Sequence, residues 1–383
     1  MSKIFLSGFY GMRNTGDDAL LAVSAWGAQT YLDADSCRVT AGELPRLPGL
    51  AQLSPIFRPA PAAHDHDRGV RMERRLRSFG AALGTRRVLF GGGSVFHTHG
   101  DLRDKLIVTR CSGGSGHLAL GVGVGPFRDT RAERTCAELF KRFAFIGTRD
   151  AESLEIARTL APDTPSAQTF DLAPLLGEAL NVAPDTARGT RRGIGIALCK
   201  DEHASDRDAR VVDSIARAIG RDAGAIDEIV LIDFNGHERL GDHPLHRALA
   251  ERIASSVPIR HLPYDPNPAA VLKTIGRLRG MVAMRLHAAV FAYLARTPTV
   301  LLSYHPKCMG WARDARLPAA VVLDRPDPAP EALYAALEAA LTGGGKPGLA
   351  LPSAIAAARQ NWLLAARAVT GVGTVRQAVR AAL

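Results

Sequence analysis

Short apolar runs alternate with longer amphipathic stretches along most of the 383 residues. The runs are rich in β-branched residues, which favours strands, and the stretches between them repeat apolar positions at the period of a helix. This alternation is typical of parallel sheets with crossover helices. In the first half it predicts strands at Ile4–Phe9, Arg87–Phe90, Leu118–Gly123, Phe143–Thr148 and Thr169–Leu172, and helices at Asp17–Tyr31, Arg131–Lys141 and Glu152–Leu160.

The pattern stops at residues 181–192, which carry Pro, Thr, Gly and charge without apolar periodicity, and then restarts. Such a break indicates an interdomain linker. The second half is predicted to contain strands at Gly193–Leu198, Glu228–Phe234, Arg260–Leu262, Gly280–Met284, Thr299–Ser303 and Ala320–Leu323, and helices at Arg207–Ile219, His243–Ser255, Pro268–Arg277, Leu286–Arg296 and Pro330–Leu341.

The length also favours two domains, because single cores usually stop growing at roughly 250 to 300 residues. The predicted fold class is α/β, with two Rossmann-like parallel-sheet domains facing across a cleft. The first domain is expected at residues 1–185, the second at 190–345, and a helical segment at 350–383. Ligands of such folds normally bind beyond the carboxyl ends of the strands.

Two segments fit the alternation less well. Glu43–Arg77 is Pro-rich and then strongly basic, and it is too long for an ordinary connection. It is interpreted either as a mobile functional loop or as a poorly packed insertion. The final helical stretch, Pro352–Leu383, could pack over either domain.

Composition narrows the class of protein. The chain is 46% hydrophobic and 6% aromatic, which is ordinary for a soluble α/β enzyme. No apolar run approaches the roughly 18 to 20 residues that a membrane span needs. The stretch Lys3–Tyr10 is interpreted as a first strand rather than a signal peptide, so a cytoplasmic location is expected.

Cysteine and histidine spacing argues against disulfides and metals. The five cysteines form no CxxC pair, and their odd number disfavours a disulfide framework. The close pairs His64/His66 and His97/His99 do not have zinc-like spacing to cysteine or acid. No metal and no cofactor are therefore predicted.

The formal charge of +10 suits anionic substrates or peripheral contact with the anionic inner face of a membrane. Arginine outnumbers lysine among the basic residues, and this excess is equally compatible with the base composition of the genome. Nucleic acid is not expected as a partner, because the basic residues are dispersed and no recognition motif occurs.

Three glycine-rich turns follow predicted strands of the first half. The first, residues 8–19, passes directly into a helix, and such a turn can bring backbone N–H groups to an anion or a hydroxyl. Asp17 could equally be a helix N-cap, and tight structural turns remain an alternative for all three. The candidate binding residues are Asn14, Gly16 and Asp17 in the first turn, Gly92, Gly93 and Ser94 in the second, and Gly123 and Gly125 in the third.

Charged side chains also follow apolar strands. Arg149 comes at the end of a predicted strand, where its guanidinium could hold phosphate or carboxylate or form a surface pair with Asp150. Arg285 and His287 flank the start of an otherwise apolar helix, which suits anion binding and proton transfer, although a structural histidine is an alternative. His305 and Lys307 follow the next strand and add further candidates.

The ordered set GFYGMRNTGDDALL, LFGGGSVF, LGVGVGP, IGTRDAES, TFDLAP and AMRLHAAVFAYLARTPTVLLSYHPK resembles the polysaccharide pyruvyltransferase family. The family has two-lobed folds of the glycosyltransferase-B type. The resemblance runs from Gly8 to about Lys307. The chain departs from the family pattern at Arg13 and His305 and in the segment Glu43–Arg77.

The resemblance implies an enzyme that moves the enolpyruvyl unit of phosphoenolpyruvate onto hydroxyls of a sugar, in a surface polysaccharide or its lipid-linked precursor, giving a pyruvate ketal. It implies anion-binding or catalytic roles for Arg149, Arg285 and His287. We further expect Lys307 to assist the two arginines in holding the phosphate and carboxylate. Two alternatives stay open. One is a glycosyltransferase that uses a nucleotide-sugar, for which Glu331 and Glu338 are the helix-spaced acids; the other is a non-catalytic protein that binds sugar or phosphate.

Overall fold

The computed structural model of the chain describes residues 2–50, 52–58, 67–182, 191–200, 205–221, 226–238, 240–253 and 257–370. Internal contacts divide the chain into two compact units. Unit 1 consists of residues 1–12, 17–182 and 354 onward, and unit 2 of residues 13–16 and 183–353. Four residues of the first glycine-rich turn therefore belong to the second unit. Most of the predicted linker lies outside the described residues.

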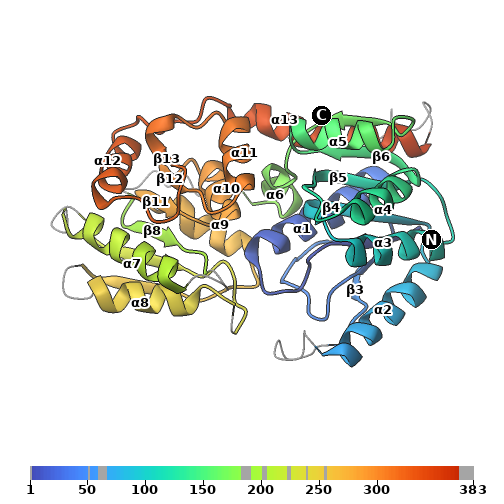
Figure 1. Cartoon of the computed structure of the whole chain (residues 1–383), viewed down its shortest axis with the longest axis horizontal. Helices are drawn as coiled ribbons and strands as arrows, with labels where there is room; N and C mark the ends of the chain where they lie inside the picture. Colours follow the sequence, from blue (N-terminus) through green and yellow to red (C-terminus); the bar gives the residue numbers. More distant parts are fainter. Residues whose placement is uncertain are drawn as a thin grey trace. The chain divides into compact units, whose positions relative to one another are not determined.

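Unit 1 contains a seven-stranded sheet in the order β3-β2-β1-β4-β5-β6-β7, with every neighbouring pair parallel. Figure 1 labels β3, β4, β5 and β6 of this sheet. The central strand β5 is buried along its whole length, as expected for a parallel sheet covered on both faces. The strands are β1 (Lys3–Ser7), β2 (Ser36–Val39), β3 (Gln52–Pro55), β4 (Arg87–Phe96), β5 (His117–Val124), β6 (Phe143–Thr148) and β7 (Ser166–Gln168).

Helices cover both faces of this sheet. Helices α2 to α5 pack side by side in chain order and share one core with the strands. On α4 and α5 the N-terminal N–H groups are capped by Asp129 and Asp150 respectively. The helices of unit 1 are α1 (Thr15–Leu32, of which Asp17 onward is in unit 1), α2 (Arg68–Leu83), α3 (His99–Cys111), α4 (Thr130–Phe140), α5 (Ala151–Leu160), α6 (Leu176–Ala179) and most of α13 (Leu351–Thr370).

The C-terminal helix α13 is part of unit 1. Trp362 is fully buried, and its ring stacks on Tyr31 of α1 with 6.0 Å between centroids. Asn361 Oδ1 accepts hydrogen bonds from the Gly121 N–H at 2.8 Å and from the Thr169 hydroxyl at 2.7 Å. The helix thus connects β5 to the segment after β7, and residues 371–383 lie outside the described range.

Unit 2 contains a six-stranded parallel sheet in the order β10-β9-β8-β11-β12-β13. Four of its strands are four-residue apolar runs that are buried throughout, and their burial contributes to the stability of this unit. The strands are β8 (Ile194–Ala197), β9 (Ile229–Ile232), β10 (Ile259–Leu262), β11 (Gly280–Ala283), β12 (Thr299–Leu302) and β13 (Val322–Leu323).

The helices of unit 2 are arranged on two faces of the sheet. Helices α7, α8 and α12 pack together over one apolar face. Helices α9 and α10 contact one another and are not part of that group. Asn267 caps α9 by accepting from the N–H groups of Ala269 and Ala270, with Pro268 at the first helical position. The bounds are α7 (Ser205–Gly220), α8 (His243–Ile253), α9 (Pro268–Gly276), α10 (Leu286–Leu294), α11 (Pro306–Asp314) and α12 (Pro330–Leu341).

Two expectations about the strands of unit 1 are corrected. The stretch Thr169–Leu172 is not a strand; the last strand is Ser166–Gln168, directly before it. The second glycine-rich run is not a turn after Phe90, because β4 continues through it to Phe96. Glycines at positions 92 and 93 take φ values of +74° and +79°, which allows the strand to bend and continue pairing with β5.

The segment Glu43–Arg77 is not simply a long loop. Its described residues include β3 and the start of α2, whose N-cap Asp67 accepts from the N–H groups of Gly69 and Val70. Residues 51 and 59–66 lie outside the described range. All five cysteines are free thiols. Among the described helices, none has both the length and the apolar character needed to cross a membrane.

Candidate anion-binding and catalytic site

Arg285 stands where β11 passes into α10, at the N-cap position with extended φ and ψ. The chain is fixed there by the N–H of Met284, which donates to the Ala197 carbonyl at the end of β8 at 2.9 Å. Neighbouring parallel strands end at the same edge of a sheet, so Arg285 lies at the carboxyl ends of β8 and β11. The position is the one where α/β folds usually bind ligands.

Asp242 holds the Arg285 guanidinium. Arg285 Nε donates to Asp242 Oδ1 at 3.0 Å, and Nη2 donates to the same oxygen. The other oxygen, Oδ2, accepts from the N–H groups of Phe234 at 3.0 Å and Asn235 at 2.9 Å. Asp242 is completely buried, so this set of donors compensates the loss of water around its carboxylate.

The ion pair fixes the charge of Arg285. Burial acts to lower the pKa of the guanidinium, but attraction to Asp242 outweighs it and the pKa is raised. Burial raises the pKa of the Asp242 carboxyl, and Arg285 and His246 offset part of that rise. Arg285 is thus a permanent cation in a fixed orientation. Its Nη1 is not used in the pair with Asp242.

His287 lies in the first turn of α10, beside the segment Arg13–Gly16. A Cβ on Gly16 would overlap the imidazole ring, so glycine is required for this approach. Asn14 Oδ1 accepts from the Gly16 N–H at 3.0 Å and thereby caps α1, and the Thr15 N–H donates to the Phe234 carbonyl at 2.9 Å. Asn14, Gly16 and His287 are therefore neighbours within unit 2.

Two groups that the sequence interpretation did not assign lie around Arg285. The Tyr304 hydroxyl interacts with the Cys199 thiol, and both interact electrostatically with Arg285. Burial raises the pKa of Tyr304 and of Cys199. Lys307 lies with its Nζ over the Tyr304 ring, 5.3 Å from the centroid, and its charge offsets part of the rise in the Cys199 pKa. The ends of β8, β11 and β12 thus bring two cations and a phenol together.

His305 is exposed and takes a structural position. It is the N-cap residue of α11, and its Nδ1 accepts from the Lys307 N–H at 3.2 Å. Capping fixes the start of the helix that carries Lys307.

Asn235 contacts the first glycine-rich turn through an isolated antiparallel bridge with Asn14.

Unit 1 has its own group of candidate residues at the ends of β4, β5 and β6. Arg149 Nη2 donates to the Ser94 hydroxyl at 2.7 Å, and its Nε lies 3.5 Å from Asp150 Oδ2. A Cβ on Gly123 would lie 2.8 Å from Arg149 Nη2, so the glycine gives the guanidinium room. Ser94, Gly123 and Arg149 are therefore brought together, and the alternative Arg149–Asp150 pair is also present.

Of the remaining candidates of unit 1, Gly92 has a packing role. A Cβ on Gly92 would lie 2.6 Å from a methyl group of Leu20, so this glycine lets α1 pack closely on β4. Gly93 and Gly125 take positive φ values of +79° and +69°. Asp17 is not an N-cap, because α1 begins at Thr15 and Asp17 lies within its first turn.

Asp242 could be found only from the fold. It lies 43 positions before Arg285, in a loop without a motif. Tyr304 was visible in the sequence directly after a predicted strand, a position that often contributes to sites. Glu331 and Glu338, the acids considered for a nucleotide-sugar, are both exposed on α12, and Glu331 pairs with Arg221.

Solved structures share this architecture over almost the whole chain. UDP-GlcNAc 2-epimerase from Neisseria meningitidis, bound to UDP-GlcNAc, has a TM-score of 0.62 at 11% identity and covers 94% of this chain and 98% of its own. The α,α-trehalose 6-phosphate synthase from Burkholderia multivorans has 0.53 at 11%, covering 100% and 97%. The trehalose-6-phosphate structure from E. coli bound with UDP-2-fluoro glucose has 0.54 at 11%, covering 100% and 98%. The two parallel-sheet units thus define a GT-B-like α/β protein.

A model of the family described as polysaccharide pyruvyl transferase matches residues 61–306, which is more than half of the chain. The chain belongs to this family. A search of curated proteins finds no match. The matched range contains Ser94, Arg149, Asp242, Arg285 and His287.

Proposed function

We propose that this protein transfers the enolpyruvyl group of phosphoenolpyruvate to two hydroxyls of one sugar, in a surface polysaccharide or its lipid-linked precursor. The products are a cyclic pyruvate ketal and inorganic phosphate. The observation that carries the proposal is the fixed cation Arg285, at a strand end beside His287 and Lys307. Family membership supports pyruvyl transfer as the reaction.

The reaction needs proton transfer and a clamp for negative charge. A proton is added to the methylene carbon of the donor, which becomes the methyl group, while a sugar hydroxyl forms a bond to the adjacent carbon. The bond from that carbon to the phosphate oxygen then breaks, and the second hydroxyl closes the ketal. One hydroxyl proton replaces the proton given to the methylene, and the other leaves with phosphate. The reaction therefore balances without an oxidant or a reductant.

The residues of unit 2 are assigned to the donor. Arg285, through Nη1, and Lys307 would bind the carboxylate and phosphate, because a pre-oriented guanidinium suits planar anions. His287 would give the proton to the methylene carbon and take one from the attacking hydroxyl, since imidazole exchanges protons near neutral pH. In unit 1, Arg149 is assigned to an anionic group of the substrates and the neighbouring glycine-rich strand ends to the acceptor.

Replacing His287 by Gln tests the assignment. We expect product formation to fall by on the order of 10² to 10⁴, with donor affinity retained within a few fold. Phosphate release and ketal formation, followed by mass spectrometry, give the rate, and calorimetry gives the affinity for phosphoenolpyruvate. His99→Gln is the matched control, because His99 lies on α3 of unit 1 and bonds Thr135. Turnover of His287→Gln close to that of the control would remove the proposed role.

A nucleotide-sugar donor is the second candidate, because two of the similar structures are bound to UDP derivatives. The two donors are separated by a depletion assay. The protein is incubated with a lipid-linked glycan and with phosphoenolpyruvate, UDP-glucose and UDP-GlcNAc together, and each donor is quantified. We expect loss of phosphoenolpyruvate alone. Consumption of a UDP-sugar would replace pyruvyl transfer by glycosyl transfer.

A further inference from the structure

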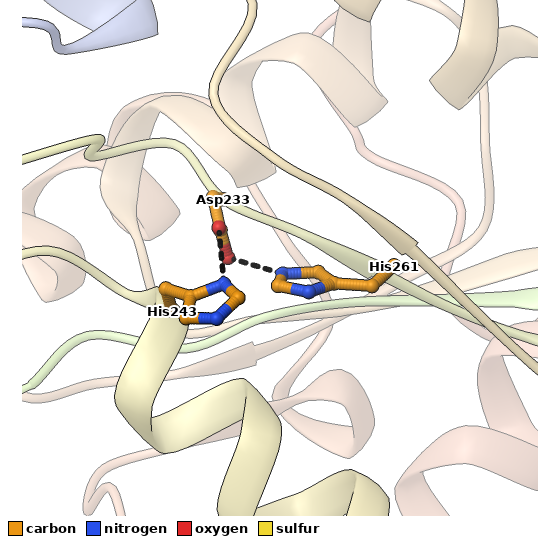
Figure 2. A group of neighbouring side chains, drawn as sticks. All are labelled: Asp233, His243 and His261. Atoms are coloured by element: carbon orange, nitrogen blue, oxygen red, sulfur yellow. Dashed lines mark hydrogen bonds and ion pairs between the residues drawn. The ribbon is translucent and has the colours of Figure 1, made fainter.

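A carboxylate and two imidazoles converge in unit 2, apart from the donor residues assigned above. Asp233 directly follows β9, His243 begins α8 and His261 lies in β10. One ligand atom from each lies within 4.8 Å of the others (Figure 2). The Asp233 side chain is 4% exposed, His261 26% and His243 59%. The cluster thus has a buried carboxylate and an outer side open to solvent.

A buried histidine keeps the Asp233 carboxylate in place. His246 is completely buried, and its Nε2 accepts from the Leu198 N–H at 3.0 Å. The ring proton therefore lies on Nδ1, which donates to Asp233 Oδ1 at 2.5 Å. The carboxylate is thus held in a fixed orientation.

The other two rings direct nitrogen atoms toward that carboxylate. His261 Nε2 lies 2.8 Å from Asp233 Oδ1, and His243 Nδ1 lies 3.5 Å from Oδ2. The two rings are stacked, with centroids 4.6 Å apart and planes 24° apart. One nitrogen of each ring and the carboxylate therefore lie close enough together to ligate a single ion.

We propose that Asp233, His243 and His261 bind a divalent transition-metal ion, with Zn²⁺ as the natural occupant. Two imidazoles and one carboxylate are typical zinc ligands, whereas Mg²⁺ and Ca²⁺ prefer oxygen ligands alone. His246 supports the site from behind by orienting the carboxylate, as outer hydrogen-bond partners of metal ligands do. Three protein ligands leave a fourth position for water on the side of His243.

The site is tested by titrating the chelator-treated full chain with Co²⁺ and Zn²⁺. Co²⁺ bound by these ligands absorbs in the visible range, and calorimetry gives the Zn²⁺ stoichiometry. We expect one equivalent to bind. His243→Ala and His261→Ala should each weaken binding by at least 10- to 100-fold, because even outer partners of metal ligands have effects of that size. His99→Ala, outside the cluster, should bind as the unmodified protein does.

His243 is exposed, so its replacement leaves the core intact, and a thermal melt without metal verifies folding of each variant. Asp233→Asn keeps the shape of the side chain and removes its charge, and it should also abolish the Co²⁺ spectrum. The proposal is overturned if neither metal binds stoichiometrically. It is equally overturned if His243→Ala and His261→Ala bind as tightly as His99→Ala.

A second inference rests on the exposed apolar side chains. Within the described part of the chain, the exposed large hydrophobic residues all lie in unit 1, either after β1 or on α2. Phe9 after β1 is 53% exposed, and Leu76 on α2 is 62% exposed. Together with the other three members, they form what we call the apolar face: Phe9, Met12, Met72, Leu76 and Leu83.

Basic side chains outnumber acidic ones around the same surface, where Asp101 and Asp104 are also present. Helix α2 carries five arginines and one glutamate, Glu73, which pairs with Arg77. Arg68 and Arg71 line an open pocket of about 860 Å³, and Phe9, Met12 and Met72 line it too. Arginine next to exposed Leu and Met on one helix is typical of helices that lie on anionic lipid.

We infer that α2 and the apolar face bind the surface of an anionic bilayer. The arginines complement anionic headgroups, at about 1 kcal/mol per basic residue near the surface, and the Leu and Met side chains can enter the boundary of the acyl region. The inference uses only unit 1 and does not depend on the donor. It is compatible with an acceptor that is anchored in lipid.

Flotation with vesicles of phosphatidylcholine alone, or with 30% phosphatidylglycerol, tests the surface. We expect binding to the anionic vesicles only, weakened by salt. Arg68→Gln/Arg71→Gln should reduce the partition coefficient about 25-fold, at roughly fivefold per arginine. Arg131→Gln/Arg134→Gln on α4 removes the same charge from exposed positions and should have a much smaller effect.

Met72→Ser/Leu76→Ser separates lipid insertion from charge alone, and it should weaken binding without changing its salt dependence. Equal binding to neutral and anionic vesicles, or equal loss in the two arginine pairs, would overturn the inference. Failure of this test leaves the donor assignment unaffected, because the residues assigned to the donor lie in unit 2 and not on α2.

Discussion

Arg285 in unit 2 and Arg149 in unit 1 follow strands in the same way, and each side chain is 14% exposed. Their partners differ. Arg285 is held by a fully buried carboxylate, whereas Arg149 donates to the hydroxyl of Ser94 and stays 3.5 Å from Asp150, whose side chain is 26% exposed. Equal burial therefore does not mean equal restraint. The first arginine has a buried charged partner whose removal would leave an uncompensated buried charge, whereas the second is restrained by a hydroxyl and a partly exposed carboxylate.

The largest expected effect on stability distinguishes Asp242, the acidic partner of Arg285, from Asp150, the acidic partner of Arg149. Asp242→Ala leaves Arg285 buried without its carboxylate and should cost about 3 to 5 kcal/mol of unfolding free energy. Asp150→Ala removes the N-cap of α5 and should cost about 1 kcal/mol. Hydrogen exchange, resolved by peptide, measures the loss in each unit separately. Similar losses in the two variants would contradict the difference in restraint.

A buried histidine of unit 1 makes the stability of this unit depend on pH, which provides a second test. His117 in β5 is completely buried; its Nδ1 accepts from the Val88 N–H, and Nε2 bonds the Thr109 carbonyl. Burial, aided by Arg142, lowers its pKa from 6.5 to about 4. The unfolded chain therefore binds a proton that the folded chain excludes. The contribution of His117 is complete above pH 6.5 and is lost as the pH falls toward 4.

The loss should reach about 3 kcal/mol in unit 1 at the acid end of this range. His117→Gln can keep one donor and one acceptor but does not titrate, so its stability should fall less steeply between pH 6.5 and 4. Urea unfolding at a series of pH values gives both slopes. Identical slopes for the two proteins would show that His117 does not have the lowered pKa.

The smallest expected effect is on the stability of two glycine variants, one in each unit. In Gly16→Ala the new methyl group would overlap the His287 ring near its base, and such overpacking costs about 1 to 3 kcal/mol. In Gly123→Ala it would meet only the end of the flexible Arg149 side chain, at 2.8 Å, and the cost should be below that range. Thermal melts rank the two variants. Gly16→Ala should also lower the rate of pyruvyl transfer. A loss of thermal stability that is seen only in Gly123→Ala would contradict the expected ranking.

Much of unit 2 could be predicted from the sequence because its strands are short, continuous apolar runs. The same property made Arg285 and His287 visible, since a charge at the end of an apolar run is conspicuous. In unit 1, β2 and β3 contain polar residues in four-residue strands, and their pattern does not differ from that of a loop. The prediction of β4 stopped at Phe90 because glycine usually ends a strand.

The partners of the site residues could not be predicted. Asp242 and Arg285 meet only because β9 and β11 both flank β8 in the sheet, and neither residue is near the other in the chain. Asp233, His243 and His261 also meet only in the folded structure, because they come from three different elements. The sequence pairs His64/His66 and His97/His99 were compared with zinc motifs, whereas the convergent histidines are separated by 17 intervening residues.

The segment Arg13–Gly16 interrupts unit 1 in the chain but belongs to unit 2 by its contacts. A protein fragment that begins after residue 182 would therefore lack the partner of the Phe234 carbonyl and the glycine that covers His287. Such a fragment would keep its sheet and yet lose part of the wall of its own site. Complementation by a short synthetic peptide spanning residues 8–19 could restore it, much as a missing strand is supplied in trans.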